Sequence, residues 1–335
     1  MSLRHGYFPG ASYTYGAYPE PSPERLALLC SLCGHRPPDL SRPFRLLDLG
    51  CGQGLQLCLQ AANYPHASFV GIDFNPDHIA HARSLAADAG LENVDFRQAD
   101  FLDLEQDPAA LGESFDLAVA HGIFGWVSPA IGAAVLRLSA AILRPGGLLY
   151  LSYNTLPGWL PALPFQHTIR SFQADHGDGM PALEAAQTLF SALQEVGAQL
   201  FDAQPGLARR LEQMSGLEGS YLLHEYNHSA WQPLYANQVI GQAQELGLSY
   251  LGSATLAENF DGLLPESFRK LLLKQKDRAQ KELVRDLLTN QSFRRDVYVN
   301  GMDPLWSREA RLHLDGLRLS RVVELENLEI GRAHV

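Results

Sequence analysis

Residues 44–54 read FRLLDLGCGQG, an apolar run that ends in a glycine-rich turn. Residues 44–49 are typical of a buried strand, and residues 56–62 after the turn have the periodicity of a helix. Glycines let such a turn approach a ligand closely, while the first N–H groups of the helix offer donors and a positive dipole. A dinucleotide fingerprint, G-x-G-x-x-G, would need a further glycine at position 55, where this chain has Leu55, so the turn disfavours nicotinamide binding.

The alternation of strands and helices continues outward from this turn. We expect strands at residues 68–73, 94–98, 115–120 and 148–153, and helices at residues 76–89 and 129–143. Strands that alternate with crossover helices form a parallel sheet. The first half of the chain therefore predicts an α/β fold of the Rossmann-like kind.

The second half is more helical. We expect helices at residues 180–201 and 206–214, and one long charged helix or a pair at residues 265–288. A helix at residues 237–246 precedes a strand at 249–254, and a further strand covers 295–300. We expect these two strands to complete the first sheet, with the helices before them inserted as a lid. An independent α+β second domain is the alternative.

These expectations divide the chain into an N-terminal arm and helix (residues 1–43), a ligand-binding core (44–159), a helical lid (160–230) and a region that completes the sheet (231–328). The last residues, 329–335, read EIGRAHV. Their back-translation resembles a sequencing-adapter sequence read in frame. We therefore exclude them from the fold and expect the natural reading frame to continue past Leu328.

Composition narrows the class of protein. The chain has 335 residues and a net charge of −11. It is 46% hydrophobic and only 19% charged, so it can bury a sizeable core, and overall disorder is excluded. The negative charge disfavours binding to nucleic acid and is compatible with a basic substrate. The sequence shows no apolar targeting segment and no apolar run of membrane-spanning length, so we expect a cytoplasmic protein without membrane insertion.

Two local patterns have simple structural interpretations. Cys30 and Cys33 form a C-x-x-C pair that reads as part of a helix packed on the core, so no metal is expected. Residues 269–295 carry nine Lys or Arg against three acids. A solvated helix face is favoured there over a surface for RNA or an acidic protein.

Three aspartates follow three successive predicted strands: Asp48, Asp73 and Asp100. Open α/β sheets bind ligands at the carboxyl ends of their strands. Asp48 suits an ammonium group, Asp73 suits a pair of ribose hydroxyls, and Asp100 suits an adenine amino group beside the ring of Phe101. The order of these acids indicates a ligand site rather than three unrelated helix caps.

With this turn and these acids, the chain resembles the class I S-adenosylmethionine-dependent methyltransferases. The resemblance implies S-adenosylmethionine as the cofactor, with its methionine end at the glycine turn, its ribose at Asp73 and its adenine at Asp100. The cofactor-binding residues it implies are Asp48, Gly50, Cys51, Gly52, Gly54, Asp73, Phe74, Asp100, Phe101 and His121.

Further segments resemble bacterial methyltransferases that carry a methyltransferase regulatory domain. They are HGIFGWV at residues 121–127, SYNTLPGW at 152–159, HEY at 224–226, GSA at 252–254 and FRRDV at 293–297. That group includes protein-lysine methyltransferases of rickettsia-like bacteria, which are longer than this chain. The resemblance implies N-methylation of lysine side chains on a protein substrate.

A small-molecule O- or N-methyltransferase and a non-catalytic S-adenosylmethionine-binding regulator are the alternatives, and a homodimer is left open. We expect the residues HEY at 224–226 to form a solvated turn. The candidate residues around the methyl acceptor lie on the N-terminal arm and after the fourth and fifth strands: Tyr13, Tyr15, His121, Tyr153 and Asn154.

Overall fold

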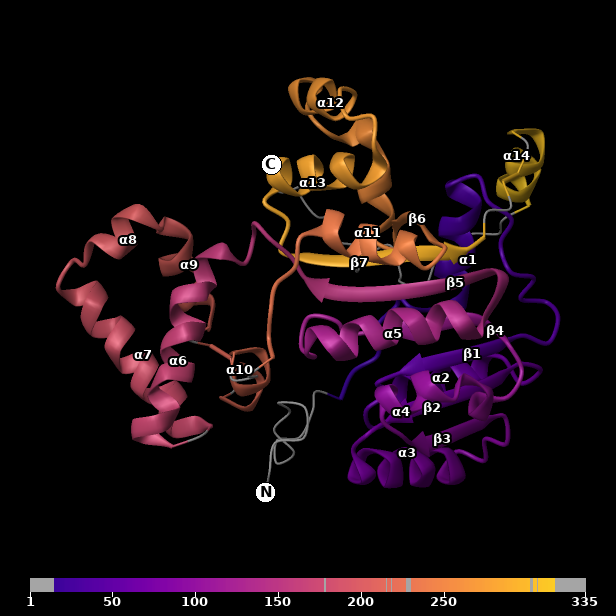
Figure 1. The fold of residues 1–335 in the computed structure, drawn as a ribbon, viewed down its shortest axis with the longest axis horizontal. Helices are drawn as coiled ribbons and strands as arrows, with labels where there is room; N and C mark the ends of the chain where they lie inside the picture. Colours follow the sequence, from indigo (N-terminus) through magenta and orange to yellow (C-terminus); the bar gives the residue numbers. More distant parts are fainter. Residues whose placement is uncertain are drawn as a thin grey trace, which may run out of the picture.

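The computed structural model describes residues 15–177, 179–214, 216–217, 219–226, 230–301, 304–305 and 307–316. Its centre is one seven-stranded sheet of order β3-β2-β1-β4-β5-β7-β6. The strands are β1 (Arg45–Leu49), β2 (Ser68–Asp73), β3 (Val94–Gln98), β4 (Phe115–Ala120), β5 (Leu143–Asn154), β6 (Leu248–Ser253) and β7 (Phe293–Asn300). The α/β fold predicted from the sequence is therefore confirmed (Figure 1).

The first five strands are parallel, and β7 pairs antiparallel with both β5 and β6. β7 is tied to β5 by a continuous register from Leu148–Val299 to Asn154–Phe293. The prediction that the last two strands complete the first sheet is confirmed. The alternative of a detached α+β domain is wrong for these strands.

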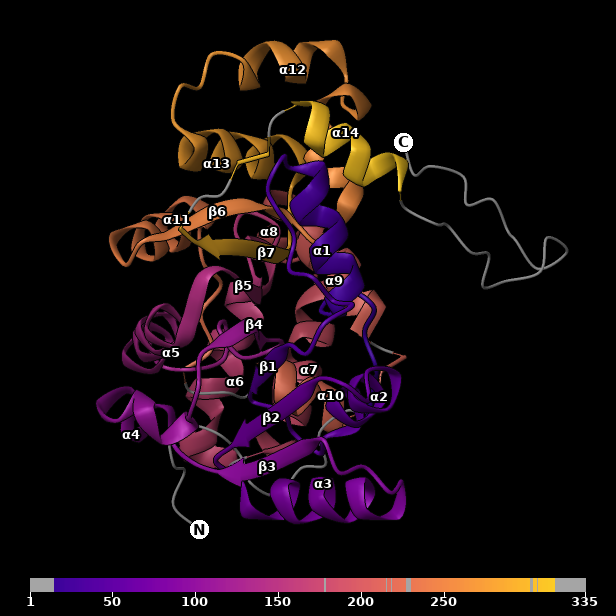
Figure 2. The same ribbon diagram turned by 90° about the vertical axis from the view of Figure 1, so that its right-hand side faces the viewer.

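Helices cover both faces of the sheet (Figure 2). One face packs against α1 (Pro23–Leu32), α2 (Leu55–Asn63) and α3 (Pro76–Asp88). The other packs against α4 (Phe101–Gln106), α5 (Pro129–Ile142), α11 (Ala236–Glu245) and α13 (Arg278–Thr289). Cys30 lies in the first of these cores, as its helix pattern predicts. A sheet buried on both faces explains why β1, β2, β4 and β5 are mostly apolar and buried without a regular alternation.

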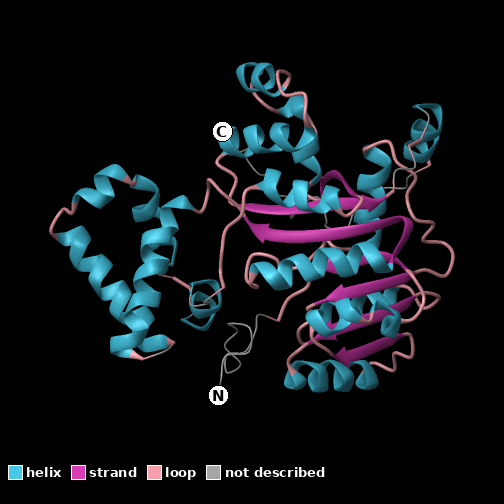
Figure 3. Ribbon diagram, in the orientation of Figure 1, coloured by secondary structure: helices cyan, strands magenta, loops and turns pink. Residues whose placement is uncertain are grey.

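A helical insertion leaves the sheet after β5. It comprises α6 (Leu163–His176), α7 (Met180–Glu195), α8 (Gln199–Ala203), α9 (Pro205–Met214) and α10 (Gly219–Tyr226), and it builds its own core around Trp159, Phe165, Phe190 and Trp231. Figures 1 and 3 show these helices grouped beside the sheet, beyond the end of β5. The division of the chain into domains stays a prediction, as does a lid function for this insertion.

Several boundaries differ from the sequence expectations. β5 begins at Leu143 rather than Leu148, because Leu143 pairs with Phe115 before the register shifts. The predicted helix at 180–201 is broken near Gly197, whose φ of +67° ends α7 before α8 begins. Residues 265–288 form a pair, α12 (Glu266–Leu272) and α13, and the remaining helix is α14 (Ser307–Asp315). Residues 329–335 lie outside the described residues.

Among the residues that the structure describes, four short 3-10 helices complete the connections: η1 (Pro108–Leu111), η2 (Leu160–Ala162), η3 (Leu256–Asn259) and η4 (Asp261–Leu263). Over the described ranges, no helix has the length and apolar character needed to cross a membrane.

Candidate active site

The glycine turn joins β1 to α2 and needs glycine at each of its three positions. Gly50, Gly52 and Gly54 have φ values of +83°, +53° and +81°, which lie in the left-handed region. A Cβ on Gly50 would lie 2.2 Å from Ile123, and one on Gly54 would lie 2.5 Å from Ala82. A Cβ on Gly52 would meet nothing within 4 Å, so the middle of the turn is open to a ligand.

Asp73, at the end of β2, is fixed by backbone donors. Its Oδ2 accepts from the N–H of Gly52 at 3.0 Å and its Oδ1 accepts from the N–H of Asn75 at 2.8 Å. A carboxylate offers about four lone-pair sites, so it can accept ribose hydroxyls in addition. The structure thereby places Asp73 against the turn in a defined orientation.

A cleft lies against the glycine turn, and the buried carboxyl group of Asp48, near the end of β1, lines it. Burial, and to a lesser degree the neighbouring carboxylate of Asp73, together raise its pKa to about 7. Two neighbouring acids attract a cation more strongly than either acid alone. The arrangement fits the ammonium group of an amino-acid ligand.

Asp100, Phe101 and Phe74 lie at the same carboxyl edge of the sheet, one or two strands away. Asp100 caps α4 by accepting from the N–H of Leu102 at 3.0 Å. Phe101 is half-buried against the core on the α4 and α5 side, and Phe74 is half-buried directly after β2. This edge therefore carries one acid and two aromatic rings near Asp73, which suit the amino group and the ring of an adenine.

The N-terminal arm and His121 form the opposite wall of the cleft. Tyr15 and Tyr18 line it together with Cys51 and His121. The rings of Tyr18 and His121 lie 4.2 Å apart, and His121 Nδ1 is 3.0 Å from the hydroxyl of Tyr150. Burial and the positive charge of Arg295 together lower the pKa of His121 to about 4, against an opposing effect of Glu20. Tyr13 lies outside the described residues.

The placement of Tyr153 corrects the sequence expectation. Its side chain is fully buried in the core under α5, and its hydroxyl donates to Asp296 Oδ2 at 2.5 Å. The side chain therefore points into the sheet packing and does not line an acceptor channel. A strand buried on both faces carries no pattern that tells the two faces apart, which is why the sequence analysis misplaced it.

Asn154 is also buried, but it faces the helical insertion. Its Nδ2 donates to Glu225 Oε1 at 2.8 Å. Burial raises the pKa of Glu225, while the Asn154 hydrogen bond and the charge of Arg210 oppose the rise. The expectation of a solvated turn at residues 224–226 is wrong: these residues end α10, and Tyr226 packs in the core of the insertion.

Glu225 is thus a candidate residue that the sequence analysis set aside. The loop after β4 passes next to its partner Asn154, because a Cβ on Gly125 would lie 3.3 Å from the backbone nitrogen of Asn154. His121 begins this loop and lines the cleft. Within the described part of the chain, no group of three His, Cys, Asp or Glu side chains could hold a metal ion.

Comparison with known proteins assigns the chain to a family. Residues 40–194 match a methyltransferase domain, and residues 218–300 match a predicted methyltransferase regulatory domain. An uncharacterised protein of Rickettsia prowazekii is 30% identical over 239 residues, which cover 70% of this chain and 89% of that protein. The chain belongs to the methyltransferases that carry this regulatory domain. The family's methyl donor is S-adenosylmethionine, and the glycine turn with its three aspartates fits it.

Two longer relatives also match most of this chain. An uncharacterised protein of Synechocystis is 35% identical over 333 residues, which cover 98% of this chain and 65% of that protein. The structure of PKMT2 from Rickettsia typhi in complex with AdoHcy superposes with a TM-score of 0.74 at 28% identity. It covers 86% of this chain, whereas the chain covers 55% of PKMT2. The chain therefore spans between about half and two thirds of these relatives.

Proposed function

We propose that this chain binds S-adenosylmethionine at the glycine turn and transfers its methyl group to the side-chain amine of a lysine on a protein. The observation that carries the cofactor assignment is the row Asp48, Asp73 and Asp100 at the carboxyl ends of β1, β2 and β3. The family membership and the AdoHcy bound in PKMT2 support it.

Each part of this edge has a task in holding the donor. Asp48 accepts from the ammonium of its methionine end, and the open backbone at Gly52 lies alongside. Asp73 accepts from the two ribose hydroxyls, and Asp100 accepts from the adenine amine. When bound, the donor supplies a methyl group on a positively charged sulfur that is open to in-line attack. The protein's contribution is mainly to position the acceptor and to exclude water.

The observation that supports an amine acceptor is the Asn154–Glu225 pair at the end of β5. The insertion carries a carboxylate to this edge, and Asn154 holds one of its oxygens. Arg210 steadies the segment, because its guanidinium lies 3.4 Å from the ring centre of Trp159 and it donates to the Tyr226 hydroxyl at 2.9 Å. A buried carboxylate beside the reacting centre attracts an ammonium group and orients it.

The acceptor ammonium has to lose a proton before its lone pair can attack, since a lysine pKa is about 10.4 in water. Desolvation and the nearby positive sulfur both lower that pKa, so the proton can leave to water without a strong base. His121 is uncharged at neutral pH because its pKa lies at about 4, and it therefore adds no positive charge that would repel the amine.

The test is a transfer assay with S-adenosylmethionine labelled with tritium on its methyl group and a lysate of the host bacterium. The label is separated into protein, RNA and small-molecule fractions, and labelled protein is hydrolysed to amino acids. We expect label in methylated lysine. Label confined to small molecules would instead indicate a small-molecule methyltransferase, and S-adenosylmethionine binding without any transfer would indicate a regulator.

A pair of matched variants tests the role of Glu225. Glu225→Gln should raise the KM for the protein acceptor by about tenfold, the equivalent of about 1.4 kcal/mol, and leave cofactor affinity unchanged. Glu195→Gln, the same substitution on the exposed end of α7, should change neither quantity. Equal KM values in the two variants would remove Glu225 from the acceptor site.

A further inference from the structure

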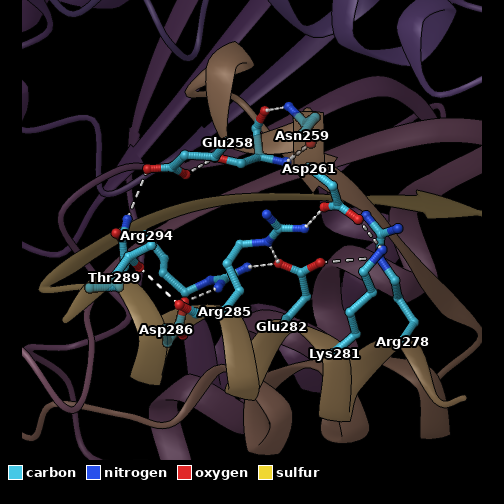
Figure 4. Close-up of polar contacts among 12 residues, drawn as sticks. Glu258, Asn259, Asp261, Arg278, Lys281, Glu282, Arg285, Asp286, Thr289 and Arg294 are labelled. Carbon is cyan, nitrogen blue, oxygen red and sulfur yellow. Dashed lines mark hydrogen bonds and ion pairs between the residues drawn. The ribbon is translucent and has the colours of Figure 1, made fainter. Parts of the chain in front are cut away.

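A second pocket lies in the region matched by the regulatory domain, away from the glycine turn. It is enclosed by the segment from Ser253 to Leu264, by one face of α13 and by the start of β7. Figure 4 shows the polar side chains of this region, with Glu282, Asp286 and Arg294 directed toward one another. None of the cofactor-binding residues assigned above lines this second pocket.

The floor of this pocket is a buried ion network. Arg294 donates to Asp296, to Asp286 at 2.6 Å and to Glu282 at 3.2 Å, and it also reaches the hydroxyl of Tyr250. Side chains 269–295 were expected on a solvated helix face. That expectation is wrong for this part, since Glu282, Arg285, Asp286 and Arg294 are each at most 7% exposed.

Among the buried groups of the network, carboxylates outnumber guanidinium groups by three to two, and the half-exposed Arg278 also pairs with Glu282 at 3.3 Å. The buried carboxylates are Glu282, Asp286 and Asp296, and the buried guanidinium groups are those of Arg285 and Arg294. Arg285 is also shared with Asp261 at the rim, where Lys281 adds a further partner. Because the arginines already pair with carboxylates, the pocket offers little to an anion.

One carboxylate oxygen of Asp286 has no hydrogen-bond partner. Its Oδ1 accepts from Arg294, but its Oδ2 is buried without a hydrogen-bond partner, and the residue is 1% exposed and lines the pocket. Leaving a buried charged oxygen unpaired is costly. Burial raises the pKa of this carboxyl to about 7, as expected for an acid whose charge the protein only partly compensates.

The remaining pocket wall is apolar. Phe260 is 46% exposed and Leu263 is 70% exposed, and both line the pocket together with Leu264. Large apolar side chains at the mouth of a pocket with a charged floor suit a ligand that has an apolar chain and a polar end.

We propose that this pocket binds a primary alkylammonium group, with its N–H groups directed to Asp286 Oδ2 and its carbon chain against Phe260, Leu263 and Leu264. The chemistry fits a free aliphatic amine and equally the side chain of a lysine on a polypeptide. Because the pocket adjoins β7, which pairs directly with β5, an occupant would contact the same sheet that carries the cofactor edge.

The experiment is a calorimetric titration of the whole chain, without cofactor, so that its result is independent of methyl transfer. n-Butylamine hydrochloride is the probe, and n-butanol is its uncharged counterpart of nearly the same shape. We expect saturable binding of butylamine, at least tenfold tighter than that of butanol. Absence of saturable binding, or equal affinity for the two probes, would overturn the proposal.

Variants locate the binding. Asp286→Asn keeps an oxygen for Arg294 but puts an NH₂ group where Oδ2 stands, and it should weaken butylamine binding at least tenfold. Leu263→Ala should also weaken binding, whereas Leu273→Ala should not, because Leu273 is 77% exposed and does not line the pocket. If Asp286→Asn fails to fold, the comparison of Leu263→Ala with Leu273→Ala tests the proposal instead. Unchanged affinity in Leu263→Ala would then contradict the assignment.

The source of the ammonium group is distinguished by a third probe, N-acetyl-lysine methylamide. Tighter binding of this probe than of butylamine indicates a lysine of a polypeptide, and weaker binding indicates a free amine. Either result requires that Asp286→Asn abolish the preference for the charged probe over butanol.

Discussion

At the residue scale, Asp48 is a buried carboxyl group near which the fold places another acid, Asp73, instead of a positive charge. Such an uncompensated acid marks a ligand site. Burial and the nearby carboxylate of Asp73 hold its pKa at about 7, far above the value of an exposed aspartate. A ligand with an ammonium group would supply the missing positive charge. The residue therefore destabilises the empty protein and stabilises the complex.

We predict that Asp48→Asn stabilises the ligand-free protein at neutral pH. Below about pH 4 the carboxyl is protonated in both states, and between pH 4 and 7 it ionises in the unfolded state first, so its contribution to stability falls as pH rises. The variant should gain about 1 to 3 kcal/mol in the free energy of unfolding at pH 7.5 and little at pH 4. Urea unfolding at the two pH values measures this difference, and an equal gain at both would contradict it.

The pH dependence of turnover is a second prediction at this scale. His121, with a pKa of about 4, does not titrate between pH 6 and 9. Asp48 does titrate in this range in the empty protein, so the assay uses saturating S-adenosylmethionine, whose ammonium group would hold Asp48 ionised. A rise in kcat should then report the deprotonation of the bound amine, with a slope of about one in log kcat against pH. Initial rates across pH 6 to 9 test this, and a flat profile would argue against an amine acceptor.

At the scale of elements, the sequence predicted best the segments whose pattern is local. The strands at residues 68–73, 115–120 and 148–153 could be predicted because they are short runs rich in Val, Ile, Leu and Phe that alternate with helical segments. Asp73 and the glycine turn could be predicted because residues that directly follow the strands of an open α/β sheet lie where such sheets bind ligands. Tyr153 was misplaced, since the side to which a doubly buried strand directs a side chain depends on its partners.

Helix α13 shows which buried residues could not be predicted from the sequence. Its sequence mixes charged and apolar residues and reads as a helix with a solvated charged face, yet Glu282 and Asp286 are buried because Arg294, on β7, pairs with them. Glu225 was set aside for a similar reason, since its partner Asn154 lies 71 positions away. Pairings between distant polar residues leave no periodic trace in a single sequence.

The ion network under α13 gives a prediction about stability. Arg294→Met leaves Asp286, Glu282 and Asp296 buried without their shared cation, which should cost about 3 to 5 kcal/mol. Arg97→Met breaks an exposed pair with Asp95 and should cost at most about 1 kcal/mol. Chemical unfolding of the two variants measures both, and similar losses would contradict the buried role of Arg294.

At the scale of the whole molecule, one sheet joins the two regions that the family models match separately. Residues 40–194 supply β1 to β5, and residues 218–300 supply β6 and β7. β7 lies between β5 and β6, so the regulatory region shares backbone hydrogen bonds with the core. Figure 1 shows α12 and α13 above that end of the sheet and the cofactor strands below.

The central claim is that the carboxyl edge of β1, β2 and β3 binds S-adenosylmethionine. The most direct test is calorimetric titration of the chain and of Asp73→Ala with S-adenosylhomocysteine. We predict saturable binding to one site per chain, weakened in the variant by about 1 to 3 kcal/mol because two hydrogen bonds to the ribose are lost. No binding to the unaltered chain, or equal affinity in Asp73→Ala, would contradict the account.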